Sequence, residues 1–112
     1  MFKITLNRIH DTVRITEGDE SITLFVDADP MRIIAGLNVA QKRLQTITEE
    51  TSDEDKDEIS LYFAGVIFGE TQAKELFDFY HEDSACLINV CGQYFSQRLA
   101  KLITKAQKKM KQ

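Results

Sequence analysis

Apolar and polar residues alternate along the first 28 positions of the chain. The apolar positions fall into three short groups, which are Phe2, Ile4 and Leu6, then Val13 and Ile15, then Ile22, Leu24 and Val26. A period of two is typical of half-buried antiparallel strands. Residues 17–20 (Glu-Gly-Asp-Glu) favour a turn between the second and third groups, and residues 7–11 must form the first turn, which leaves Ile9 unexplained. The pattern predicts a three-stranded β-meander over residues 1–28.

The period changes at Asp29-Pro30. An aspartate before a proline favours the start of a helix, because the carboxylate caps free amide groups and the proline N–H is not needed there. Apolar residues then recur at spacings of three and four, in the order Ile33, Leu37, Ala40, Leu44 and Ile47. This spacing predicts an amphipathic helix. Gly36 lies near the apolar stripe, so a neighbouring element has room to approach closely.

Three further helices follow from the remaining pattern. Residues 51–54 resemble a capping box and Gly69 a helix stop, so a second helix lies between them. Thr71 is suited to cap a short third helix that ends near residues 81–83. The last helix begins at Asp83 or Ser84, and its stripe comprises Leu87, Ile88, Cys91, Tyr94, Phe95, Leu99, Leu102 and Ile103. Residues 104–112 have few apolar anchors, which predicts fraying.

Strands that precede helices indicate an α+β fold and argue against a doubly wound parallel sheet. We therefore predict a short N-terminal antiparallel β-meander (1–28) followed by a bundle of about four helices (29–112). At 112 residues the chain fits one domain. No apolar run approaches the roughly 20 residues that span a bilayer, and the first residues lack the continuous apolar run of a signal peptide. We expect a cytoplasmic protein without membrane contact.

Charge is sorted along the chain. Residues 1–48 hold six basic and six acidic side chains, residues 49–83 hold twelve acids and two lysines, and residues 84–112 hold six bases and no acid. The three parts sum to the overall net charge of −4. Opposite patches on one small protein favour association with a partner or with further copies of the same chain. This distribution points to a binding or assembly protein.

The sequence offers little for catalysis. It contains no glycine-rich phosphate loop, and His10 and His81 stand beside acids without a recognisable nucleophile. Cys86 and Cys91 are spaced unfavourably for a disulfide on a helix and lack the companions of a zinc site, so buried structural thiols are favoured. We expect no enzyme activity, no cofactor and no metal.

The acidic run after residue 48 has three interpretations. It could be a solvated loop with a charged first helical turn, a partner-facing patch or a metal site, but the pattern of a calcium loop is missing because no glycine occurs in it. The partner-facing candidates are Glu49, Glu50, Asp53, Glu54 and Asp55.

The basic C-terminal run has similar alternatives. Arg98, Lys101, Lys105 and Lys108 follow helical spacing and are predicted to share one face, with Tyr94 as the nearest aromatic. The face could be solvated, bind a protein or hold phosphates, although lysines without interleaved aromatics are poorly suited to reading bases. Phe79 lies off the stripe of the short helix, which indicates either core packing on two sides or a contact for a partner helix.

The segment Phe68-Gly69-Glu70-Thr71-Gln72-Ala73-Lys74-Glu75-Leu76-Phe77-Asp78-Phe79-Tyr80 carries a resemblance, which continues through residues 85–95 and 103–109. It resembles small tail-region proteins of long-tailed phages and prophages of Gram-positive bacteria, which look like tail assembly chaperones. The resemblance implies a factor that coats a tape-measure-like client and associates with itself while the tail tube polymerises. The alternative is a nucleic-acid-associated phage factor that uses the basic C-terminal helix.

Overall fold

The computed structural model describes residues 1–3 and 7–110, and the α+β prediction is confirmed. Strand β1 (Ile9–Glu17) pairs with strand β2 (Glu20–Ala28) in an antiparallel hairpin, and the register runs without a bulge from Ile9↔Ala28 to Glu17↔Glu20. Gly18 has a φ of 61° at the first central position of the two-residue turn. Glycine is favoured there because its lack of a Cβ permits positive φ.

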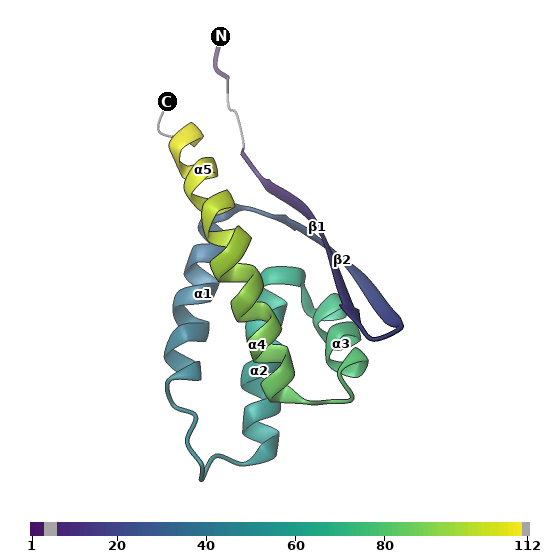
Figure 1. Ribbon diagram of the computed structural model, residues 1–112. Coiled ribbons are helices and arrows are strands. Elements are labelled where there is room, and N and C mark those ends of the chain that lie inside the picture. The colour runs from purple at the N-terminus through teal and green to yellow at the C-terminus, as the bar shows by residue number, and fades with distance from the viewer. Residues whose placement is uncertain (4–6, 111–112) are drawn as a thin grey trace.

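Four helical rods follow the hairpin (Figure 1). Helices α1 (Pro30–Leu44) and α2 (Asp53–Phe68) run side by side in opposite directions, and α3 (Glu70–Phe79) lies beneath the hairpin. The last rod is continuous and consists of α4 (Ser84–Tyr94), a π-helical turn η1 (Phe95–Leu99) and α5 (Ala100–Met110). The predicted long final helix is therefore confirmed, and it carries Ala106 into the core.

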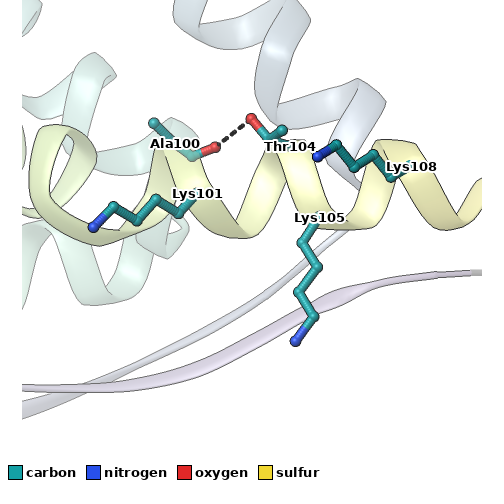
Figure 2. A pocket seen from close by; sticks show the side chains of 5 residues that line it. All are labelled: Ala100, Lys101, Thr104, Lys105 and Lys108. Atoms are coloured by element: carbon teal, nitrogen blue, oxygen red, sulfur yellow. Dashed lines mark hydrogen bonds between the residues drawn. The ribbon is translucent and has the colours of Figure 1, made fainter.

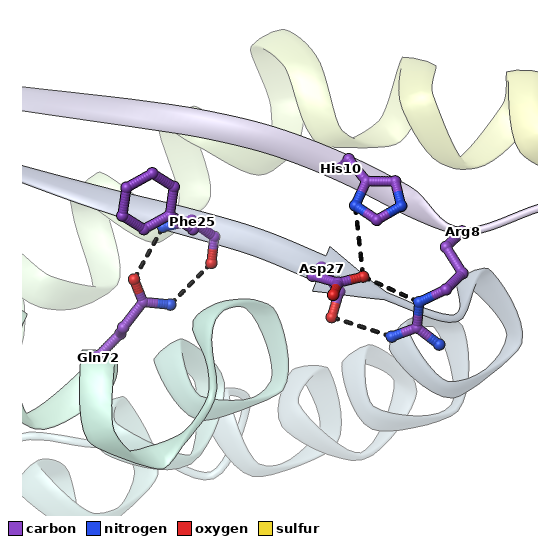
Figure 3. A network of polar contacts seen from close by, with 5 residues as sticks. All are labelled: Arg8, His10, Phe25, Asp27 and Gln72. Atoms are coloured by element: carbon purple, nitrogen blue, oxygen red, sulfur yellow. Dashed lines mark hydrogen bonds and ion pairs between the residues drawn. The ribbon is translucent and has the colours of Figure 1, made fainter.

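The predicted three-stranded meander is wrong for the described residues, which form a two-stranded sheet. Ile9 belongs to β1 and is 3% exposed, so residues 9–11 are strand and not turn. Arg8 donates to the Asp27 carboxylate at 2.9 Å, next to the end of β2 (Figure 3). Residues 4–6 of the predicted first strand lie outside the described residues.

Side-chain caps determine where most helices begin. The carboxylate of Asp29 accepts from the Met31 amide at 3.0 Å, Ser52 Oγ accepts from Asp55 at 3.1 Å, and Asp83 accepts from Cys86 at 3.2 Å. These contacts satisfy amides that have no partner within the helix. Gly69 ends α2 with a φ of 86°, as predicted, and it also precedes α3 directly. Thr71 therefore lies inside α3 and is not its cap.

One apolar cluster joins the hairpin to all the helices. Leu24 from β2, Leu76 from α3 and Leu87 and Leu99 from the last rod are fully buried. Their burial supplies the main stabilisation of the fold, at roughly 1.5–3 kcal/mol for each side chain. The hairpin alone would be marginally stable, and this shared cluster is what positions it.

The π-helical turn keeps the apolar residues before and after it on the side of the last rod that faces the core. Buried residues before the turn are spaced by four and three, as Leu87, Cys91 and Tyr94, but the next buried residue is Leu99, five positions later. A wide turn with i→i+5 hydrogen bonds accommodates this spacing. Phe95, which the sequence pattern places in the stripe, is instead 36% exposed.

Gly36 is the point of closest approach between α1 and α2. A Cβ atom at this position would lie 2.7 Å from Cγ1 and 2.9 Å from Cγ2 of Val66. Valine has a single strongly preferred rotamer in a helix, so it has little freedom to move aside. The close approach expected from the sequence is thus present, and it requires a glycine.

We predict that Gly36→Ala destabilises the protein by about 1–2 kcal/mol, because overpacking exceeds the gain in helix propensity. Chemical denaturation monitored by circular dichroism measures this change. Val66→Ala removes the two clashing methyl groups, so in that background Gly36→Ala should become neutral or stabilising. An equal loss in both backgrounds would contradict the proposed contact.

Candidate interaction surfaces

A buried carboxylate ties the hairpin to the last rod. Asp11 lies on the inward face of β1, and its side chain is 6% exposed. The hydroxyl of Tyr94 donates to Asp11 Oδ2 at 2.8 Å, and Arg98 binds the same carboxylate through two nitrogens, with Nη2 to Oδ1 at 2.8 Å. A charge in this position needs such partners, because an unpaired buried carboxylate is strongly unfavourable.

The partners also fix the protonation of the cluster. Hydrogen bonding from Arg98 holds the pKa of the Asp11 carboxyl below its ordinary value of 3.8. Burial raises the pKa of the Tyr94 hydroxyl, and the hydrogen bond to Asp11 raises it further. At neutral pH the carboxylate is therefore charged and the phenol keeps its proton, which is the combination that the hydrogen bond requires.

Two predicted partner-facing residues thus have structural roles. Tyr94 is 9% exposed and its ring lies 5.7 Å from that of Phe68. The Arg98 side chain is 59% exposed, and its guanidinium is paired with Asp11. Arg98 thus differs from the three lysines in having an ion-pair partner, and its place in a shared basic face stays a prediction.

The remaining basic residues stay on the outside of α5. Lys101, Lys105 and Lys108 are exposed and, with Ala100 and Thr104, line an open hollow of about 370 Å³. Figure 2 shows Lys101 and Lys105 extending in different directions, while Thr104 donates to the Ala100 carbonyl at 2.9 Å. The ammonium groups do not converge on one point. This arrangement gives a broad positive surface and not a cradle for one small anion.

The acidic candidates lie together in and after the loop between α1 and α2. Glu49, Glu50, Asp53, Glu54 and Asp55 are all exposed. Local hydrogen bonds shape the loop, since the Thr48 amide donates to Thr51 Oγ1 at 2.8 Å. The first turn of α2 places the last three acids near the positive end of the helix dipole, which stabilises them there.

The two charged regions lie at opposite ends of the molecule. The chain measures 55 × 34 × 22 Å, and Figure 1 shows the α1–α2 loop at one end and the C-terminal part of α5 at the other. Among the described residues, the ion pairs from these regions are Arg43–Glu58 and Arg98–Asp11, and neither joins one region to the other. The opposite charges are therefore not neutralised within the fold.

Phe79 is half-buried and packs against the core. Its ring meets that of Tyr80 edge-on, with the centroids 5.2 Å apart. This contact favours the core-packing alternative over a partner contact.

An apolar strip on α1 was not found from the sequence pattern. Met31, Ala35 and Val39 are exposed at spacings of four, with exposed fractions of 55% for Met31 and 47% for Val39. The sequence does contain this strip, as a second apolar repeat next to the stripe that faces the core. The strip was overlooked because the core-facing stripe alone was enough to predict an amphipathic helix.

The two thiols and His10 are held by burial or by a neighbouring acid. Burial raises the pKa of the Cys91 thiol to about 12, and the Cys86 thiol donates to Asp83 at 3.4 Å. His10 lies in β1 with Nδ1 3.4 Å from Asp27, and not in a turn as expected. In the part of the chain described, no three potential metal-binding side chains cluster together, and no helix is long and apolar enough to cross a membrane.

No protein-family model, curated protein or solved structure matches this chain.

We predict that Tyr94→Phe lowers the free energy of unfolding at pH 7 by about 1.5 kcal/mol, because Asp11 loses one hydrogen bond to its charge.

Since the pKa of Asp11 is lowered on folding, the contribution of Asp11 to the free energy of unfolding is complete above the unfolded pKa near 3.8 and is lost as pH falls through the folded pKa. Denaturation curves of wild type and Asp11→Asn between about pH 2 and 7 measure this effect. The difference in free energy of unfolding between wild type and Asp11→Asn should decrease as the pH falls. A difference that stays constant across this pH range would contradict the prediction.

Proposed function

We propose that this protein is a non-enzymatic assembly factor, namely a tail assembly chaperone or tail morphogenesis factor of a phage or prophage, acting in the cytoplasm of the bacterial host. It binds a long helical, tape-measure-like client and associates with further copies of itself. The observation that carries this proposal is the separation of unneutralised acidic and basic regions to opposite ends of an elongated molecule. The resemblance of residues 68–80 and the segments after them supplies the client class.

The charge separation supports head-to-tail association. An acidic loop on one copy can approach the α5 lysines of the next, and such heterologous contacts generate rings or open filaments. The molecule is several times longer than the ~8 Å Debye length at physiological salt, so each end acts as a separate charged surface. Exposed ion pairs are worth only about 0–1 kcal/mol each, which gives reversible contacts suited to a transient coat.

The strip on α1 supports client binding. Met31, Ala35 and Val39 form an apolar seam along a helix, and such seams pack against an amphipathic partner helix. Many weak sites along one long client would act together through multivalency.

The lysine-lined hollow supports a second candidate, a nucleic-acid-associated phage factor. Lys101, Lys105 and Lys108 could neutralise successive phosphates, with affinity that falls steeply as salt rises. The diverging ammonium groups favour nucleic-acid binding less than protein binding, since the α5 lysine surface has neither converging phosphate ligands nor aromatic side chains on which bases could stack.

We predict that Lys101→Glu with Lys105→Glu abolishes salt-dependent association. Sedimentation of wild type should show larger species at about 0.01 M salt than at about 1 M, where the Debye length is only ~3 Å. A matched control, Lys42→Glu with Lys74→Glu, changes the net charge equally at exposed lysines outside α5 and should behave as wild type. Equal effects of both pairs would contradict a specific basic surface. Retention of random duplex DNA that is unaffected by the α5 pair would contradict the use of the basic C-terminal helix for binding nucleic acid.

We also predict that Met31→Glu with Val39→Glu prevents the protein from keeping its client soluble. The client to be co-expressed is the product of a neighbouring, very long helical reading frame, and the measurement is the soluble fraction of that product. Asn38→Glu with Gln41→Glu places the same two charges at exposed polar positions of α1 and serves as control. A genome without such a neighbouring frame, or a client equally soluble with both variants, would contradict the proposal.

A further inference from the structure

The two edges of the hairpin are treated differently by the rest of the molecule. Gln72 of α3 covers the edge of β2, because its Oε1 accepts from the Phe25 amide at 2.8 Å and its Nε2 donates to the Phe25 carbonyl at 2.7 Å (Figure 3). Phe25 therefore directs both backbone groups away from β1. Since Phe25 pairs with Thr12, this is a non-hydrogen-bonded pair of the antiparallel ladder.

The register then fixes which backbone groups of β1 point outward. Hydrogen-bonded and non-hydrogen-bonded pairs alternate, so His10, Thr12, Arg14 and Thr16 present their N–H and C=O groups to the far side. Within the described residues, the Thr12 amide is bound by the Asp11 side chain, and no protein hydrogen bond is made by the amides of the other three. A strand edge of this kind is a template for a further strand.

Some of the usual protections of an edge are missing from β1, although the inward-facing charge of Asp11 is one that it has. It is nine residues long and contains neither a proline nor a bulge. Its basic side chains also lean away from the free edge, because His10 lies against Asp27 and Arg14 reaches Ser21 Oγ at 3.5 Å, both on β2. Below the edge, Val13 and Ile15 are only half-buried, whereas Leu24 and Val26 of β2 are fully buried.

We propose that β1 pairs with β1 of a second copy of this chain in an antiparallel, two-fold symmetric contact that joins two hairpins into one four-stranded sheet. Charge selects the register. With Val13 on the axis, Arg14 faces Thr12 of the second copy and His10 faces Thr16, so no like charges lie opposite one another. A shift by one step toward the turn would set Arg14 opposite Arg14 and Asp11 opposite Glu17, which is unfavourable.

This contact differs from the head-to-tail association proposed above and does not depend on the client. It is isologous and built from backbone hydrogen bonds, so it closes as a dimer and persists in high salt. The α5 contacts are heterologous and weaken in high salt. Together the two contacts predict dimers that associate end to end through their charged regions.

The test is sedimentation over a concentration series at about 1 M salt, where charge contacts are screened. Arg14→Pro removes an outward N–H that the hairpin itself does not use, and it should convert the dimer to monomer. Arg14→Ala controls for the lost charge. Thr23→Pro places proline at the residue paired with Arg14, where the N–H points to the opposite edge, and it should remain dimeric.

Circular dichroism should show that the two proline variants keep the same helical content and have melting temperatures within a few degrees of each other. Hydrogen exchange gives an independent measure, because the Arg14 and Thr16 amides should become protected as concentration rises while Thr23 does not. A wild type that is monomeric throughout, an Arg14→Pro protein that still dimerises, or a Thr23→Pro protein that does not, would each overturn the inference. Loss of the dimer on deletion of residues 1–6 would assign the contact to the N-terminal segment and overturn it as well.

Discussion

The inward-facing carboxylate of Asp11 is the constraint on which the arrangement of this molecule depends. A hairpin strand with a charge on its apolar face can settle on a core only where that charge finds partners. Tyr94 and Arg98 provide them from the last rod, 83 and 87 residues away in the chain. The π-helical turn lets Leu99 enter the core while Arg98 reaches the strand. This polar contact ties the hairpin to the last rod and pairs the charge of Arg98, whose side chain stays 59% exposed, with a buried carboxylate.

The direction of the helices determines how far apart the acidic loop and the basic helix α5 lie in the folded molecule. Helix α1 leads away from the hairpin to the acidic loop, α2 returns, and the last rod runs so that the C-terminal part of α5 lies at the opposite end of the molecule. The same sequence folded with the acidic loop beside α5 would have neutralised itself. Because the fold keeps the two regions apart, both remain available to other molecules.

The hairpin has one covered and one less covered strand edge, and α1 has one buried and one exposed apolar stripe. Gln72 covers the β2 edge at Phe25, whereas on the β1 edge Asp11 binds only the Thr12 amide and those of His10, Arg14 and Thr16 have no protein partner among the described residues. The core stripe of α1 is buried, whereas Met31 and Val39 are not.

Several features follow from local chemistry and were predictable from the sequence. Asp29-Pro30, Ser52 and Asp83 start helices because a short polar side chain can bind nearby amides whatever the rest of the chain does. Gly18 and Gly69 adopt positive φ for an equally local reason. The close approach at Gly36 was also expected, although its partner Val66 could not be identified from spacing alone.

What the tertiary structure decided involves residues far apart in the chain. Ile9, which the pattern left unexplained, belongs to β1 because it pairs with Ala28, and Arg8 binds Asp27 beside it; only the folded hairpin brings these residues together. Likewise the sequence pattern placed Tyr94 in the apolar stripe and Arg98 on a basic face, but it could not identify Asp11, far away in the chain, as their shared partner. Periodicity reports which side of an element is apolar, whereas the partner of a buried charge depends on which elements meet, and that is set by packing of the whole core.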